Sequence, residues 1–301
     1  MKFTSWRYAD LRNDMAKEKK KKLSRRITAL IACGAFILFL ALVAFGLQIA
    51  FWASHGSIGC VQPDYERLDL DGYLDGELTD EDYGVLYRQT GLTKIGIDRA
   101  LKKGETGKRL IKQIQADLFE PHEVMFGQVA PYACTDYIEK HVANTYLEDG
   151  DIIITSSTHI SFVRIGHAGL VTNGNLANVM QANAYGTYSR IGTVRDFTDR
   201  VNFIILRPNP DLIDKTVIDG VVKYATANLI GIPYEGLAGL LTNKNDIRKT
   251  QCAHVIWYAF KQFGIDLDSN GGCMVVPYDL ANSAYLQPVQ VFGFDLDKLW
   301  R

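Results

Sequence analysis

The longest apolar stretch of the chain predicts a helix that crosses a membrane. Ile27 to Trp52 contains no charged residue and is interrupted only by the polar Thr28 and Gln48. A helix of this length, at about 1.5 Å per residue, can cross a hydrocarbon layer of about 30 Å with some tilt. The competing interpretation is a buried core helix, which rarely combines such a run with a basic flank. We therefore predict a transmembrane helix over residues 27–53.

The charges on either side of this helix predict its orientation. Residues 1–26 hold ten of the 33 Lys and Arg and three of the 34 Asp and Glu, so this tail carries +7 and the rest of the chain −8. No Lys or Arg follows the helix before Gln62. The positive-inside rule then makes residues 1–26 a cytoplasmic tail and places the rest outside the cell membrane. The membrane is thus an expected partner, and nucleic acid is not.

Residues 54–145 form an acidic, helical region in this interpretation. Helical periodicity is clear over 83–89, 95–101 and 106–119, whereas 122–146 shows no definite period. The acidic segment 71–82 resembles a calcium-binding loop, but one position that needs an oxygen ligand holds Tyr73. The favoured interpretation is a surface turn followed by a helix that Thr79 caps, with Asp82 as the capping-box partner. No metal or other cofactor is therefore expected.

The second half of the chain changes period and predicts a separate domain over residues 146–301. Short β-branched segments separated by Gly and Asn indicate strands, and later segments with apolar residues three and four apart indicate helices. Four antiparallel strands beside two helices predict an α+β domain with helices packed against the sheet. The strands are expected over 151–155, 167–172, 178–182 and 202–206, and the helices over 217–229 and 252–263.

Four of the five cysteines lie after the predicted membrane helix, in an oxidising exterior. If Cys252 stays reduced, Cys60, Cys134 and Cys273 cannot all pair with one another. We prefer a Cys60–Cys134 disulfide, with Cys134–Cys273 as its competitor. The segment Ser57–Cys60 also loosely matches a lipoprotein cleavage box, so lipidation of Cys60 is the alternative to a retained anchor.

Cys252 is the strongest candidate for chemistry. Thr250 can cap the helix that follows, which leaves Cys252 in its first turn, where the helix dipole and unsatisfied N–H groups favour a thiolate. The same N–H groups can stabilise an oxyanion. Buried cysteines are common, so a small core residue is an equally good interpretation of this position taken alone.

His167 and a polar residue on the next strand complete the candidate site. His167 lies between Gly166 and Gly169, which leave room around an imidazole that can act as the base for Cys252. Gln181 is the best-placed residue to orient that ring through its other nitrogen, and Asn183 has the same strand parity. The competing interpretations are a structural histidine and a solvent-facing edge residue. The six histidines lack the spacing of a metal site.

The order of these segments resembles the YiiX/YaeF-like branch of the NlpC superfamily, which consists of permuted papain-like cysteine hydrolases. The resemblance covers most of residues 80–295, and no single motif decides it. It implies Cys252 as nucleophile, His167 as base and Gln181 as the third polar residue, although many permuted members carry Glu at that place. It also places Tyr234 near the cleft, where a core tyrosine is the other interpretation. The segments that carry the likeness are Gly150–Ile154, Gly166–Val171, Val179–Ala182, Gly231–Tyr234, Cys252–Ala259 and Pro277–Ala281.

Three functions are compatible with these residues. The first is a membrane-anchored cysteine amidase or peptidase, for which cell-wall peptides are a reasonable substrate class because the domain is expected outside the cell. The second is an acyltransferase or lipid hydrolase that uses the same residues. The third is a non-catalytic binding or scaffold protein, which the amide at Gln181 and the acidic region suggest. We expect the first.

Overall fold

The computed structural model describes residues 4–53, 59–130, 133–160 and 163–297. Contacts within the chain divide it into two compact units, Met1–Trp52 and Ala53–Arg301. The first unit is a helix and the second contains helices and two antiparallel sheets, so the predicted α+β class with an N-terminal apolar helix is confirmed. Each unit is described by itself.

The N-terminal unit is one helix, α1, over Thr4–Ala53. Its segment Lys19–Ala50 is long and apolar enough to cross a membrane, and none of its most apolar window is buried. The basic residues before the apolar run are also helical and belong to the same helix, α1.

Four short helices begin the second unit and enclose a small core of their own. They are α2 (Asp71–Leu74), α3 (Asp80–Thr90), α4 (Lys94–Leu101) and α5 (Glu105–Phe119). Gly107 lets α4 and α5 approach closely, because a Cβ there would lie 1.7 Å from the carbonyl oxygen of Ala100. The buried apolar residues of this core are Leu70, Leu74, Leu86, Leu92, Ile97, Ala100, Ile111 and Ile114.

The acidic segment before α3 is the predicted surface turn and helix cap. Thr79 and Asp82 form a reciprocal capping box at the start of α3. Two further carboxylates pair with lysines of α5, since Lys112 contacts Asp71 and Lys108 lies 2.5 Å from Asp75. These carboxylates therefore serve the helix start and the packing of α5 against the turn.

A four-stranded antiparallel sheet has the order β1-β2-β4-β5, and its first two strands lie in the region 122–146 whose period was indefinite. Its strands are β1 (Val124–Ala130), β2 (Ala133–Ile138), β4 (Thr158–Ile160) and β5 (Val163–Arg164). Apolar side chains of β1 such as Met125 and Phe126 are half exposed. This explains why no alternation of buried and exposed positions marked the strand.

A six-stranded antiparallel sheet forms the centre of the unit, in the order β10-β9-β3-β6-β7-β8. β3 lies between β6 and β9, so Ile152 faces Leu170 on one side and Leu206 on the other. Four of these strands were predicted, whereas β8 and β10 were not. The strands are β3 (Ile152–Thr155), β6 (His167–Asn173), β7 (Asn178–Gln181), β8 (Arg190–Thr193), β9 (Phe203–Pro208) and β10 (Leu286–Phe292).

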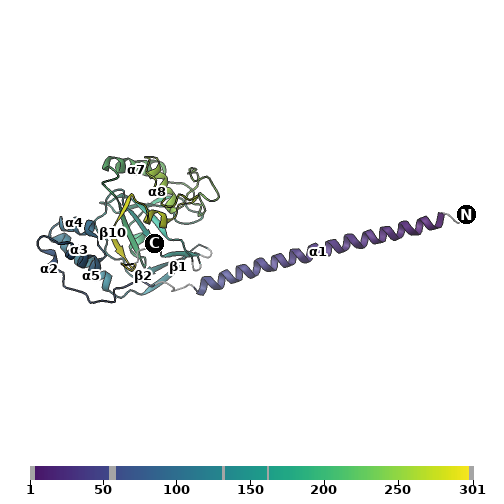
Figure 1. Cartoon of the computed structure of the whole chain (residues 1–301), viewed down its shortest axis with the longest axis horizontal. Coiled ribbons are helices and arrows are strands. Elements are labelled where there is room, and N and C mark those ends of the chain that lie inside the picture. Colours follow the sequence, from purple (N-terminus) through teal and green to yellow (C-terminus); the bar gives the residue numbers. More distant parts are fainter. Residues whose placement is uncertain (1–3, 54–58, 131–132, 161–162, 298–301) are drawn as a thin grey trace. The chain divides into compact units, whose positions relative to one another are not determined.

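Both faces of this sheet are covered, and alternate residues of β6 enter different cores. Ala168 and Leu170 pack in a core with α7 (Lys215–Asn228) and α8 (Cys252–Lys261), which lie side by side in Figure 1. Val171 packs in the opposite core with Phe197 of the short helix α6 (Arg195–Thr198). A last short helix, α9 (Pro277–Ala281), borders α8.

The preferred disulfide and its competitor are both absent. Cys60 and Cys273, which lie in the described residues, are free thiols, so neither is bonded to Cys134. Cys60 packs against the core that holds Phe197, and burial raises the pKa of its thiol to about 12, whereas Cys273 is exposed. In the lipoprotein-like segment, Ser57 and Ile58 lie outside the described residues.

Candidate active site

Cys252 is the first residue of α8, as predicted, but the cap of this helix differs from the prediction. The N-cap is Gln251, whose side-chain oxygen accepts the backbone N–H of Ala253 at 2.8 Å. The same oxygen lies 3.4 Å from the Cys252 sulfur. Thr250, the predicted cap, instead bonds the Nδ1 atom of His254 at 2.9 Å. Both residues therefore fix the start of α8, and Gln251 holds the thiol directly.

The Cys252 sulfur is surrounded by backbone N–H groups. Those of Cys252, Ala253 and Ala168 all favour the thiolate, and Ala168 belongs to β6 on the central sheet. Burial nevertheless dominates and raises the pKa of the thiol to about 11. The prediction that Cys252 ionises easily is therefore wrong for this arrangement. The free energy needed to bury a thiolate away from water exceeds the stabilisation that the three N–H groups provide.

His167 begins β6 and is hydrogen-bonded to Gln181 of the neighbouring strand. Its Nε2 atom lies 2.9 Å from the Oε1 atom of Gln181, and its ring stacks on Phe197 with 5.2 Å between centroids. Burial lowers the pKa of His167 to about 4, and Arg200 acts in the same direction. The imidazole is therefore neutral at pH 7 and can accept a proton.

The choice between Gln181 and Asn183 is settled by burial. Gln181 is fully buried and contacts the imidazole, whereas Asn183 is exposed. Gly169 was expected to leave room around the imidazole of His167, but in the structure it leaves room for a different side chain. A Cβ at Gly169 would lie 2.4 Å from Val179 and 2.7 Å from the Phe197 ring, so this glycine admits the ring on which His167 stacks.

Asp196 also belongs to this constellation and was not identified from the sequence. The Nε2 atom of Gln181 donates to its Oδ2 atom, and the backbone N–H of Thr193 reaches the same oxygen at 3.3 Å. Gly192 makes this contact possible, because a Cβ there would lie within 2.3 Å of both Gln181 and Asp196. An acidic residue just inside a short helix was the available signal, but nothing linked it to Gln181.

Tyr234 lies beside the thiol. The backbone around it pairs with the residues before α8, since the N–H of Glu235 donates to the Thr250 carbonyl at 2.7 Å. Burial raises the pKa of Tyr234, and the neighbouring Cys252 adds to this rise. The Tyr234 ring meets Tyr185 edge to face, with centroids 5.3 Å apart. One aromatic side chain, Tyr234, therefore lies near the sulfur, and Tyr185 packs against it.

The two halves of the candidate site meet at one peptide of β6. The Cys252 sulfur contacts the N–H of Ala168, and His167 is the preceding residue. The imidazole itself stacks against Phe197, and within the described chain no hydrogen bond joins it to the sulfur. The thiol thus contacts the residue that follows His167, whereas Gln181 and Phe197 hold the imidazole in its orientation.

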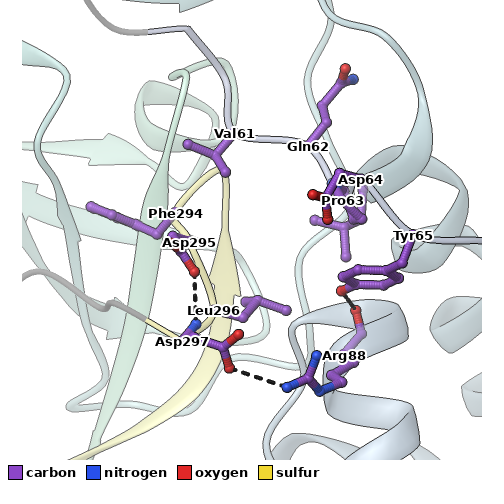
Figure 2. A pocket seen from close by; sticks show the side chains of 11 residues that line it. Val61, Gln62, Pro63, Asp64, Tyr65, Arg88, Phe294, Asp295, Leu296 and Asp297 are labelled. Atoms are coloured by element: carbon purple, nitrogen blue, oxygen red, sulfur yellow. Dashed lines mark hydrogen bonds and ion pairs between the residues drawn. The ribbon is translucent and has the colours of Figure 1, made fainter.

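Clusters of metal-ligating side chains and cavities are the other features that can mark a site. Among the described residues, no three His, Cys, Asp or Glu side chains gather closely enough to hold a metal ion. A cavity of about 390 Å³ lies between residues 61–65, Arg88 and residues 294–297, and none of the predicted site residues lines it (Figure 2). Arg88 and Asp297 pair across it at 3.4 Å. This cavity is separate from the chemistry around Cys252.

Comparison of the chain with protein-family models, with curated proteins and with solved structures finds no match. The function is therefore inferred from the residues and geometry of the site.

Proposed function

We propose that this chain is a membrane-anchored cysteine hydrolase of the permuted papain-like type, related to the YiiX/YaeF-like branch of the NlpC superfamily. The observation that carries the proposal is the contact between the Cys252 sulfur and the N–H of Ala168, beside a His167 ring that Gln181 holds. A thiol at a helix start, a base on a facing strand and an amide behind the base are the parts of a cysteine hydrolase.

The reaction begins from the neutral pair. As a substrate carbonyl reaches Cys252, the thiol proton passes to Nδ1 of His167 and Sγ bonds to the carbonyl carbon. The N–H groups at the start of α8 face the developing oxyanion. The tetrahedral intermediate collapses to a thioester, and the leaving amine or alcohol takes the proton from Nδ1. Water then attacks the thioester with His167 as base, which releases the acid and restores the thiol.

The anchor and the charge asymmetry support an extracytoplasmic site. α1 contains one segment that can cross a membrane, and the basic residues precede it. The positive-inside rule then puts the second unit outside, where peptides of the cell wall are the substrate class we propose.

A lipid or other long-chain acyl substrate is the second candidate, and one surface favours it. The loop after Tyr234 exposes Leu237, Leu240 and Leu241 to 40%, 56% and 68%. Tyr185, which contacts Tyr234, is also exposed. Exposed apolar side chains in the loop that follows Tyr234 suit an acyl chain better than a polar peptide.

The decisive test is labelling of the full chain in detergent with an electrophile that acylates or alkylates reactive thiols. Labelling of Cys252 that is lost in C252A and retained in C273S supports the hydrolase. Labelling at Cys134 or Cys273 with Cys252 unmodified contradicts it. Turnover of matched amide and long-chain ester substrates, with and without L240E/L241E, then separates the two substrate classes. A His167→Ala variant with unchanged thiol reactivity would favour a binding protein instead.

A further inference from the structure

The Gln181 amide is hydrogen-bonded at both of its ends. Its oxygen faces the Nε2 atom of His167 at 2.9 Å, and its nitrogen donates to the carboxylate of Asp196. Gln181 is fully buried, so the side chain has no water with which to exchange these bonds. The amide therefore links the imidazole to a carboxylate on the other side of β7.

The carboxylate decides which way the amide points. An ionised carboxylate only accepts hydrogen bonds, so it binds the NH₂ end of Gln181 and leaves the oxygen for His167. That oxygen only accepts, so the proton on the imidazole must be at Nε2. The lone pair is then at Nδ1, which is the nitrogen that has to receive the proton of the Cys252 thiol.

The chain around Asp196 keeps the carboxylate in place. The backbone N–H of Thr193 binds the same oxygen, and Gly192 leaves the space in which the amide and the carboxylate meet. The next residue, Phe197, stacks on the imidazole with its ring plane only 6° from that of His167. The segment 192–197 thus fixes His167 in two ways. Phe197 stacks on the imidazole directly, and Asp196 acts on it indirectly by binding the Gln181 amide.

We infer that Asp196 is a positioning residue of the active site, which fixes the Gln181 amide and through it the imidazole tautomer that serves as base. This inference rests on the proposed function for its catalytic meaning. The carboxylate touches neither the thiol nor the carbonyl of a substrate; it acts through Gln181 alone.

The experiment compares D196A with D196N in the full chain, using ¹⁵N-labelled histidine and NMR to identify the protonated ring nitrogen of His167. The amide side chain of D196N still offers an oxygen to Gln181, whereas the methyl group of D196A offers none. We expect the Nε2–H form in the wild type and in D196N, and a mixture of both tautomers in D196A. The signal of His167 is assigned by its loss in H167Q, and D211A, at an exposed aspartate, serves as the control.

The second measurement is the rate at which a thiol electrophile acylates Cys252 at pH 7. We expect a loss of roughly 10- to 100-fold in D196A, by analogy with the loss seen when a hydrogen-bond partner behind a metal-binding histidine is removed, and near-normal rates in D196N and D211A. An unchanged tautomer in D196A overturns the inference. If the tautomer changes but wild-type Cys252 never forms an acyl-enzyme, the positioning holds and the hydrolase proposal fails.

Discussion

The sulfur of Cys252 lies at the backbone N–H of Ala168, directly after His167 in the chain. A helix start and a strand start, separated by more than eighty residues of sequence, therefore meet at one peptide group. The N–H of Ala168 is a fixed donor, because β6 is hydrogen-bonded on both sides to β3 and β7. The position of the sulfur thus depends on the central sheet as much as on α8.

The reactivity of Cys252 should rise steadily with pH. Burial raises the pKa of its thiol to about 11, so the thiolate fraction increases about tenfold per pH unit below that value. We expect the alkylation rate, measured by mass spectrometry in a C273S background, to climb from pH 7 to pH 10. A plateau that begins below pH 7 would instead indicate a thiolate–imidazolium pair.

The protein should lose stability in acid through His167. The pKa of this residue is about 4 in the folded state and about 6.5 when unfolded, so the unfolded chain binds more protons between these values. Stability then falls as the pH drops from about 7 to 4, by roughly 3 kcal/mol. The measurement is denaturant unfolding of wild type and H167Q across this range.

A control is needed because burial also lowers the pKa of His254, which acts in the same direction. H254Q should remove only its own part of the acid effect. An acid loss that is the same in H167Q and wild type would contradict the prediction for His167.

Replacement of Gln181 by Glu should be tolerated only with a second change. Q181E alone places two carboxylates in contact, because Gln181 now donates to Asp196. One of them must then take up a proton or move, which we expect to cost about 1–3 kcal/mol. Q181E/D196N restores a single negative charge and moves it beside His167, so the pKa of His167 should rise above its wild-type value. Denaturation and histidine NMR test both statements; equal stability of Q181E and wild type would be inconsistent with them.

The buried ion pair between Arg207 and Asp151 should contribute strongly to the free energy of unfolding. Arg207 donates to both carboxylate oxygens, at 2.8 and 2.7 Å, and Asp151 is fully buried. Removal of Asp151 leaves Arg207 with only the partly exposed Glu148, 3.1 Å from its Nη1 atom, as a charged partner, so D151A should lose about 3 kcal/mol of unfolding free energy. A double change to R207L/D151A should lose less than D151A alone. Chemical denaturation gives both values, and a loss below about 1 kcal/mol in D151A would refute the assignment.

Gly169 should be required for the orientation of His167. A Cβ at this position would overlap Val179 and the Phe197 ring, so G169A must displace the ring on which the imidazole stacks. We expect a loss of about 1–3 kcal/mol from overpacking and a slower acylation of Cys252. G84A, in the exposed part of α3 where no atom lies within 4 Å of the added Cβ, should be neutral or stabilising. Thermal unfolding and the labelling assay compare the two variants.

The elements with an unbroken apolar period were predictable, and those without one were not. β3, β6, β7 and β9 are buried on both faces and stand out as β-branched runs. β10 contains Pro288 at a shift in its register, and β8 is largely exposed. A proline within a strand and the exposure of a strand on both faces each interrupt the apolar pattern from which strands are predicted.

Some residues of the candidate site were likewise predictable from the sequence, and others were not. His167 and Gln181 lie on neighbouring strands, at positions whose side chains point to the same face of the sheet. Their contact was therefore predictable from the strand pattern. Gln251 was missed because glutamine is not among the usual N-caps, and Thr250 seemed to fill that place. Asp196 was missed because its contact depends on the close approach of two side chains at Gly192 of β8, which only the folded backbone defines.

Because successive residues of β6 enter opposite cores, the strand has only one functional alignment. Sliding it by a single residue would carry the imidazole away from Gln181 and Phe197, which hold it in place. A one-residue insertion within β6, between His167 and Val171, would thus displace the imidazole although His167 remains in the chain. The spacing of residues along this strand is therefore as necessary to the site as their identity.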